Sequence, residues 1–134
     1  MLVIKKDQIE HFIAEDNTRL IRVITEIIRE AFFESVEDYS DETLESMVKI
    51  GINRAKSHGF ERAEHIASFV AIMFEISPNF DMIGSIQSVL TDKSIPDEGK
   101  FEQLLGLTTE EDWQEAEKSY DSTVWFPENG DGKK

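Results

Sequence analysis

Three histidines, His11, His58 and His65, are the side chains in this sequence best suited to bind a metal or transfer a proton. A zinc site needs three or four ligands, and two ligands on one helix are normally about four residues apart. His58 and His65 are seven residues apart with Gly59 between them, so they need not share a helix face. We therefore expect no metal site. Instead, we expect His58 to stabilise the C-terminal end of a helix, where the helix dipole favours an imidazole.

Catalytic motifs are missing from the sequence as well. It contains no cysteine, no Gly-x-Ser-x-Gly motif, and no glycine-rich phosphate loop. Neighbouring acids such as Asp41 and Glu42 could exchange protons or bind a cation. Consecutive acids at the start of a helix are, however, typical of caps and dipole partners. The sequence therefore predicts a protein that is not an enzyme and that uses no cofactor.

Length and charge restrict the class of protein further. The chain has 134 residues, 28 acidic against 14 basic side chains, a formal net charge of -14 and 40% hydrophobic residues. This composition predicts one folded domain with a hydrophobic core. Such a charge disfavours binding to nucleic acid or to anionic membranes, so the expected partner is a neutral or basic protein. The longest apolar stretch, Ile66 to Phe74, is broken by Ser68 and is far shorter than the roughly 20 residues of a membrane span. We expect the protein to act in the cytosol.

Half of the excess negative charge lies in the last third of the sequence. Residues 91–134 carry 12 acidic and 5 basic side chains, a net charge of -7. Aromatic residues alternate with these acids, and aromatic anchors surrounded by charge are typical of protein-binding surfaces. Alternatively, Trp113 and Tyr120 belong to the core of an amphipathic helix. Trp125 and Phe126 lie outside any clear helix, which favours exposure. The predicted interface comprises Glu110, Glu111, Asp112, Trp113, Glu115, Trp125 and Phe126.

Apolar residues recur at helical spacing over most of the chain, and no segment shows the alternation of a strand. A long N-terminal helix is predicted for residues 5–33, with a possible kink or break at residues 15–18. Ser40 is predicted to cap the second helix and Gly59 to end it in a left-handed conformation. Thr108 and Glu111 match a capping box for the last helix. Further helices are predicted for residues 61–76, 83–90 and 97–105.

The predicted fold is therefore all-α, a single compact bundle of five to six helices over residues 1–126. The apolar helix at residues 61–76 is expected to be the most buried element. Pro78 is predicted to end that helix, Phe80 to insert into the core, and Asp81 to cap the following helix. Residues 127–134 are polar and contain glycine, and we expect this tail to be disordered.

The middle of the sequence resembles a family of small helical proteins encoded beside type VI secretion effectors. Similar residues run through two predicted helices and their ends: Gly51-Ile52-Asn53-Arg54-Ala55, His58-Gly59-Phe60-Glu61, Ile66, Phe69, Ile72, Met73 and Pro78-Asn79-Phe80-Asp81. The likeness covers roughly residues 1–105. This chain has Ser77-Pro78 where the family pattern has Gly-Pro, and Met82, Ile83 and Gly84 where the pattern has an acidic-Pro-Trp element.

The resemblance implies a role in toxin handling, because such genes lie beside those for VgrG spikes, PAAR tips, effector adaptors and toxins. The leading hypothesis is a non-catalytic chaperone or adaptor for an effector. The alternative is a cytosolic immunity protein that binds and inhibits a cognate toxin. A DNA mimic that blocks a nucleic-acid-binding protein, and a hydrolase without a recognisable motif, are further alternatives.

Overall fold

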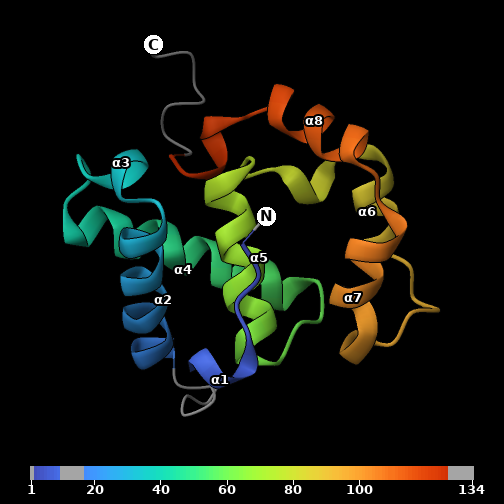
Figure 1. Ribbon diagram of the computed structural model, residues 1–134, viewed down its shortest axis with the longest axis horizontal. Helices are drawn as coiled ribbons and strands as arrows, with labels where there is room; N and C mark the ends of the chain where they lie inside the picture. The colour runs from blue at the N-terminus through green and yellow to red at the C-terminus, as the bar shows by residue number, and fades with distance from the viewer. Residues whose placement is uncertain (1, 10–16, 127–134) are drawn as a thin grey trace. The chain divides into compact units, whose positions relative to one another are not determined.

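The computed structural model describes residues 2–9 and 17–126, and over these residues the chain is helical and contains no strand. Eight α-helices and two short 3₁₀ helices are described (Figure 1). The predicted all-α class is confirmed. The chain divides into two compact units, residues 1–75 and 76–134. The single domain over residues 1–126 stays a prediction, and the tail at 127–134 lies outside the described residues.

Five helices are described in the first unit: α1 (Lys6–Ile9), α2 (Asn17–Ala31), α3 (Phe33–Val36), α4 (Asp41–Ser57) and α5 (Ala63–Glu75). The predicted long N-terminal helix is not confirmed, because α1 and α2 are described as separate elements. The predicted break at residues 15–18 lies partly outside the described residues, but its last two positions, Asn17 and Thr18, belong to the first turn of α2. The compact bundle of five to six helices is likewise not confirmed.

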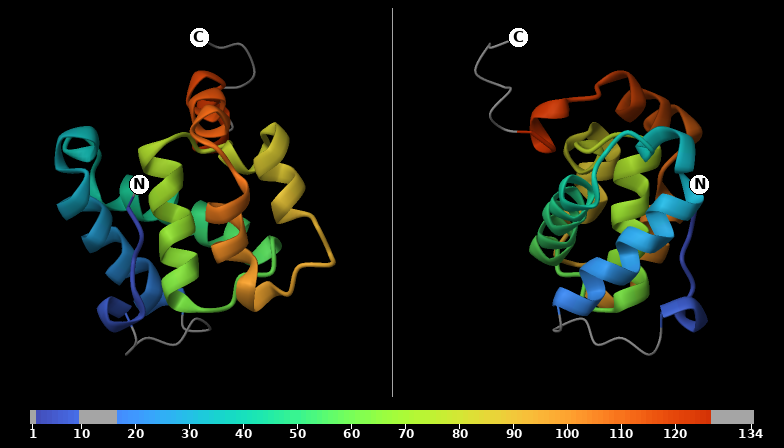
Figure 2. Two further views of the ribbon diagram at one scale, coloured as in Figure 1. Left: turned by 45° about the vertical axis from the view of Figure 1, so that its right-hand side comes forward. Right: turned by 90° about the vertical axis from the view of Figure 1, so that its left-hand side faces the viewer.

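The core of the first unit forms around α5, as the apolar circumference of that helix predicts. Helices α1, α2 and α4 each pack against α5 (Figure 2). Its residues from Ile66 to Met73 are all buried. One face of α2 contributes Leu20, Ile24 and Ile28, each fully buried, and this four-residue spacing keeps them on one side of the helix.

Gly51 allows α4 and α5 to approach closely. A Cβ atom at this position would lie 2.9 Å from Val70 Cγ2 and 3.2 Å from Met73 Sδ, both on α5. Contacts this short force a neighbouring side chain to move, and a packed core resists such movement. Glycine in the middle of a helix is otherwise unfavourable, so the close packing accounts for its presence here.

We predict that Gly51→Ala lowers the free energy of unfolding by about 1–2 kcal/mol, because overpacking outweighs the gain in helix propensity. Urea denaturation followed by circular dichroism measures the difference. Gly106→Ala is the matched control, since a Cβ atom there meets nothing within 4 Å. The control is expected to raise stability by up to about 1 kcal/mol. A stabilised Gly51→Ala protein would contradict the packing role.

The predicted caps of α4 are confirmed at both ends. At the N-terminus, the Ser40 hydroxyl accepts a hydrogen bond from the Thr43 N–H at 3.1 Å. At the C-terminus, Gly59 has a φ of 94°, a conformation that favours glycine. The Gly59 N–H donates to the Lys56 carbonyl, and the Phe60 N–H donates to the Ala55 carbonyl. This pair of bonds is a Schellman motif, and it places the buried Phe60 ring in the core.

The N-terminal segment lies along α5 through a buried serine. Ser68 Oγ accepts from the Ile4 N–H at 2.8 Å and donates to the Ile4 carbonyl at 3.2 Å. Farther along α5, Glu75 Oε1 accepts from the Leu2 N–H at 2.8 Å. Ile4 is 2% exposed, so both of its backbone polar groups obtain partners in place of water. The serine that interrupts the apolar stretch therefore satisfies buried backbone groups.

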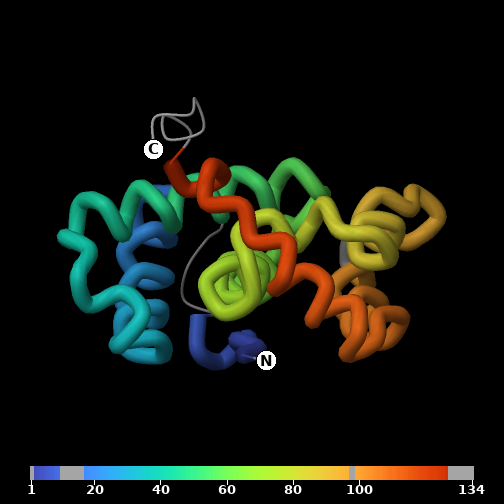
Figure 3. Tube along the Cα trace, turned by 90° about the horizontal axis from the view of Figure 1, so that it is seen from above, coloured from blue at the N-terminus to red at the C-terminus, as the bar shows by residue number. Residues whose placement is uncertain are grey.

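The second unit contains η1 (Phe80–Met82), α6 (Gly84–Leu90), α7 (Asp97–Leu107), α8 (Glu110–Lys118) and η2 (Ser122–Val124). Only Thr108 and Thr109 separate α7 from α8 (Figure 3). Pro78 follows the end of α5 and is buried. Phe80 is fully buried, which confirms its predicted place in the core.

Asp81 does not have its predicted role as a helix cap. It lies inside η1 and is 4% exposed, and the N-cap position of α6 is Ile83, which makes no side-chain capping bond. The prediction was wrong because Asp81 folds into its own 3₁₀ turn, two residues before the N-cap position of α6.

Candidate functional site

Helix α8 holds most of the residues predicted to form an interface, and it divides them between two faces. Glu110, Glu111 and Glu115 are exposed, and so is the further acid Glu117. On the inner side Ala116 is fully buried. The acids thus form the outer face of an amphipathic helix. This arrangement is expected whether α8 binds a partner or only covers the core.

The N-terminus of α8 is closed by a capping box one residue later than the sequence predicted. Thr109 Oγ1 accepts from the Asp112 N–H at 3.2 Å, and Asp112 Oδ2 accepts from the Thr109 N–H at 2.7 Å. Two overlapping Thr-x-x-acid frames occur here, and Thr108 with Glu111 is not the one used. Asp112 therefore serves as a capping residue, while Glu111 stays exposed.

Thr108 has a different role, because it fixes Trp113. Its hydroxyl donates to the Leu104 carbonyl at 2.7 Å and accepts from Trp113 Nε1 at 3.0 Å. The indole also packs on Phe80, with ring centroids 5.8 Å apart. Trp113 is half-buried, so it anchors α8 to η1 and offers only part of its ring to the surface.

The C-terminal end of α8 is held by Asn79. Its Nδ2 donates to the Ser119 carbonyl, and its Oδ1 accepts from the Asp121 N–H, each at 2.9 Å. Asn79 is 7% exposed, and these bonds occupy both ends of its amide. Sequence patterns gave Asn79 no role beyond its place in the resembling segment Pro78-Asn79-Phe80-Asp81, and they missed this contact. No local spacing signals it, because the partners are about 40 residues away.

Asp121 shapes the segment after α8. Its carboxylate accepts hydrogen bonds from the Thr123 hydroxyl at 2.6 Å and from the Thr123 N–H at 3.0 Å, which begins η2. These bonds stabilise the charged form and hold the pKa of Asp121 below its usual value. Asp121 is exposed, so it adds a further negative charge to the surface just after the end of α8.

Trp125 does not lie on the surface as predicted. Only 4% of the residue is exposed, and Phe126 is half-buried. The short helix η2 turns the chain so that Trp125, which caps the turn, enters the core, an effect that apolar periodicity does not reveal. By contrast, Tyr120, expected to follow the apolar side of the helix, is 53% exposed. Leu107, just before α8, is 57% exposed.

Within residues 2–9 and 17–126, no group of three or more His, Asp or Glu side chains is arranged to hold a metal ion. No helix among these residues is long and apolar enough to span a membrane. In the second unit, the outer face of α8 and its two ends carry four exposed glutamates, the exposed Asp121 and two exposed apolar side chains. We call this surface, comprising Glu110, Glu111, Glu115, Glu117, Asp121, Leu107 and Tyr120, the α8 surface.

The fold and this surface define the chain as an acidic, all-helical protein with a negatively charged helix face. Compared with known proteins, it matches no family model, no curated protein and no solved structure.

Proposed function

We propose that the protein is a non-catalytic binding module that attaches to a basic protein partner through the α8 surface. The observation that carries the proposal is the arrangement of four exposed glutamates on a helix fixed at both ends. The capping box and Trp113 hold the N-terminal end, and Asn79 holds the C-terminal end. A helix held in this way loses little conformational freedom on binding, which favours affinity.

The chemistry of the α8 surface suits a protein better than a small cation. Leu107 and Tyr120 flank α8, and each exposes more than half of its surface. Apolar side chains contribute affinity at protein interfaces, while the surrounding charge steers the partner and excludes anionic competitors. The net charge of -14 adds a long-range attraction for a basic protein.

The type VI secretion setting rests on the sequence resemblance, and there we propose that the partner is an effector and that this protein is its chaperone or adaptor in the cytosol. Three residues of the resembling segments have packing roles here: Gly51 in the contact between α4 and α5, Gly59 in the cap, and Phe80 in the core. Such residues maintain a fold. Partner choice then falls to the acidic surface that lies after the resembling region.

An immunity protein is the second candidate, because the acidic α8 surface would also fit the basic active-site cleft of a nucleic-acid-cleaving toxin. Co-expression with the neighbouring toxin separates the two roles. Restored growth indicates immunity, whereas unchanged toxicity together with a requirement for this protein in secretion indicates an adaptor.

We predict that the variant E110Q/E111Q/E115Q loses most of its affinity for the captured partner, by about tenfold or more at low salt. Pull-down with the full chain identifies the partner, and calorimetry then measures the dissociation constant. The matched control is E34Q/E37Q/D38N, which removes three exposed acids from the first unit. Both variants lose three negative charges, so both go from -14 to -11.

The two variants distinguish a local contact from general attraction. Equal weakening by both would show that only the net charge matters and would contradict docking at α8. A complex that DNA displaces, with a partner that binds nucleic acid, would instead support a DNA mimic. Failure of the chain to bind any protein encoded beside it would count against the adaptor and the immunity roles alike.

A further inference from the structure

A polar groove runs between α2 and α4 in the first unit, well apart in sequence from α8. Its wider part has a volume of about 250 Å³ and its narrower part about 140 Å³. Arg22 and Glu45 line both parts, so the two adjoin. The lining also includes Thr18, Ile21, Thr25, Glu26, Arg29 and Asp41.

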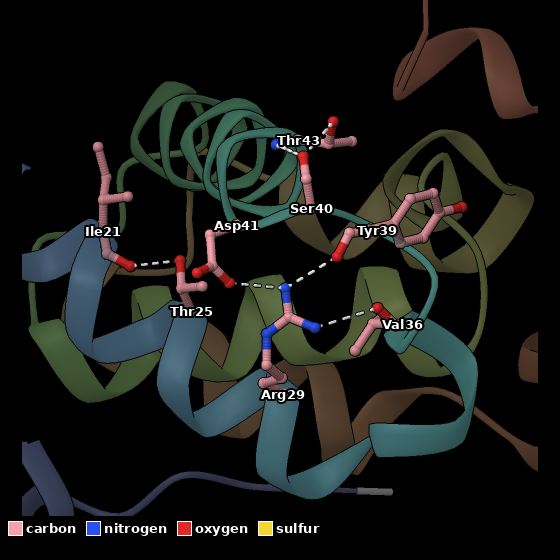
Figure 4. A network of polar contacts seen from close by, with 8 residues as sticks. All are labelled: Ile21, Thr25, Arg29, Val36, Tyr39, Ser40, Asp41 and Thr43. Atoms are coloured by element: carbon pink, nitrogen blue, oxygen red, sulfur yellow. Dashed lines mark hydrogen bonds and ion pairs between the residues drawn. The ribbon is translucent and has the colours of Figure 1, made fainter.

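Arg29 lines the wider part of the groove, and its guanidinium makes three hydrogen bonds to residues 36–41 (Figure 4). One terminal nitrogen donates to the Val36 carbonyl at 3.3 Å. The other donates to the Tyr39 carbonyl and to Asp41 Oδ1, both at 3.0 Å. These bonds tie the end of α2 to the start of α4. The Arg29–Asp41 ion pair therefore joins the two walls of the groove, and its opposite charges cancel.

The remaining groups of the groove present more acceptors than donors. The Thr25 hydroxyl donates its proton to the Ile21 carbonyl at 2.6 Å and keeps only acceptor capacity. Within the described residues, neither Glu26 nor Glu45 forms an ion pair or a hydrogen bond through its carboxylate. Arg22 is the one lining cation besides Arg29 in this part of the chain. Two carboxylates against one guanidinium leave a net charge of -1.

We propose that this groove binds an arginine side chain of a protein partner. A guanidinium has five N–H donors and no acceptor, which complements a groove that offers carboxylates and a hydroxyl oxygen. It is also less strongly hydrated than the ammonium of lysine, so it enters a partly enclosed site at lower cost. A groove of this size accepts one long side chain, with the adjoining peptide lying across α2 and α4. Arg22 disfavours a bare metal ion in the same place.

The test uses the full-length protein and a blocked Gly/Ser peptide that contains two arginines, followed by amide NMR spectra during titration. The control peptide contains citrulline, which keeps the shape of arginine without its charge. We expect the arginine peptide to shift the amides of α2 and α4 around Glu26 and Glu45, and the citrulline peptide to leave them unchanged.

Two variants with opposite expected effects test the contacts. Glu45→Gln is expected to weaken the peptide about threefold, and Arg22→Gln to strengthen it about threefold, as for exposed charge contacts. Glu42→Gln is the matched control, because Glu42 is an exposed acid of α4 that does not line the groove. It is expected to leave the affinity within about 1.5-fold, since salt screens charges that are not in contact.

Three results would overturn the proposal: no amide shifts along the groove, equal effects of Glu45→Gln and Glu42→Gln, or equal binding of a lysine peptide. Amide shifts confined to α8 would contradict arginine binding in the groove but would agree with the proposed function of the α8 surface. Conversely, groove binding that survives in E110Q/E111Q/E115Q would establish a second contact surface independent of α8.

Discussion

Replacing Phe80 with alanine is expected to lower the free energy of unfolding by about 3–5 kcal/mol, a large part of the stability of a protein of this size. Phe80 is fully buried, so the substitution removes a whole ring from the core and leaves a cavity. The ring also packs against Trp113 at 5.8 Å between centroids, and its loss leaves one side of the indole without contacts.

The same substitution at an exposed phenylalanine provides the control. Phe33 is 58% exposed, and Phe33→Ala is expected to change stability by no more than about 0.5 kcal/mol. Urea denaturation with circular dichroism compares the two variants, and tryptophan emission reports the surroundings of Trp113. Similar stabilities of Phe33→Ala and Phe80→Ala would show that Phe80 is not a core residue.

Helix positions were predictable wherever one local signal decided them. Ser40 precedes two acids and an apolar periodic segment, and it caps α4. Gly59 follows a basic last turn, and its left-handed conformation ends that helix. Both signals act over a few residues through backbone hydrogen bonds, so the sequence alone contains the information.

Competing local signals produced the errors. Thr108 and Thr109 both match a capping box, and the choice between them depends on Trp113, whose indole N–H uses the Thr108 hydroxyl. Once that hydroxyl is engaged, Thr109 is the residue that can cap α8. Asp81 likewise has the residue type of a cap but lies within η1. Tertiary contacts decide such cases, and residue spacing does not show them.

Long-range polar contacts could not be predicted from sequence patterns. Arg29 lies on a helix among residues with no signal for a tertiary contact, yet it joins α2 to residues 36–41. Asn79 similarly links η1 to the end of α8. Each residue meets backbone groups that have no side-chain signature. The candidate groove is lined by Arg29, and the end of α8 is held by Asn79. The structure was therefore needed to find the groove and the α8 surface.

Substitution of Trp125 by alanine is expected to have the second large effect, and it separates a core role from the interface role that the sequence suggested. Trp125 is 4% exposed, so Trp125→Ala is expected to cost about 3–5 kcal/mol of unfolding free energy. If Trp125 were instead a surface anchor, the variant would keep its stability and lose only affinity for a partner.

Tyr120→Ala is the matched control for Trp125→Ala, because Tyr120 is an aromatic residue of the same segment with 53% exposure. We expect the opposite pattern from it: stability within about 0.5 kcal/mol of the original protein, and weaker binding of the partner at the α8 surface. Thermal and urea denaturation, measured beside partner affinity, give both quantities for each variant. If Trp125→Ala is as stable as Tyr120→Ala, the result would support the predicted interface role of Trp125. A loss of stability in Trp125→Ala alone would leave Tyr120 and Leu107 as the apolar contacts of the α8 surface, surrounded by its glutamates.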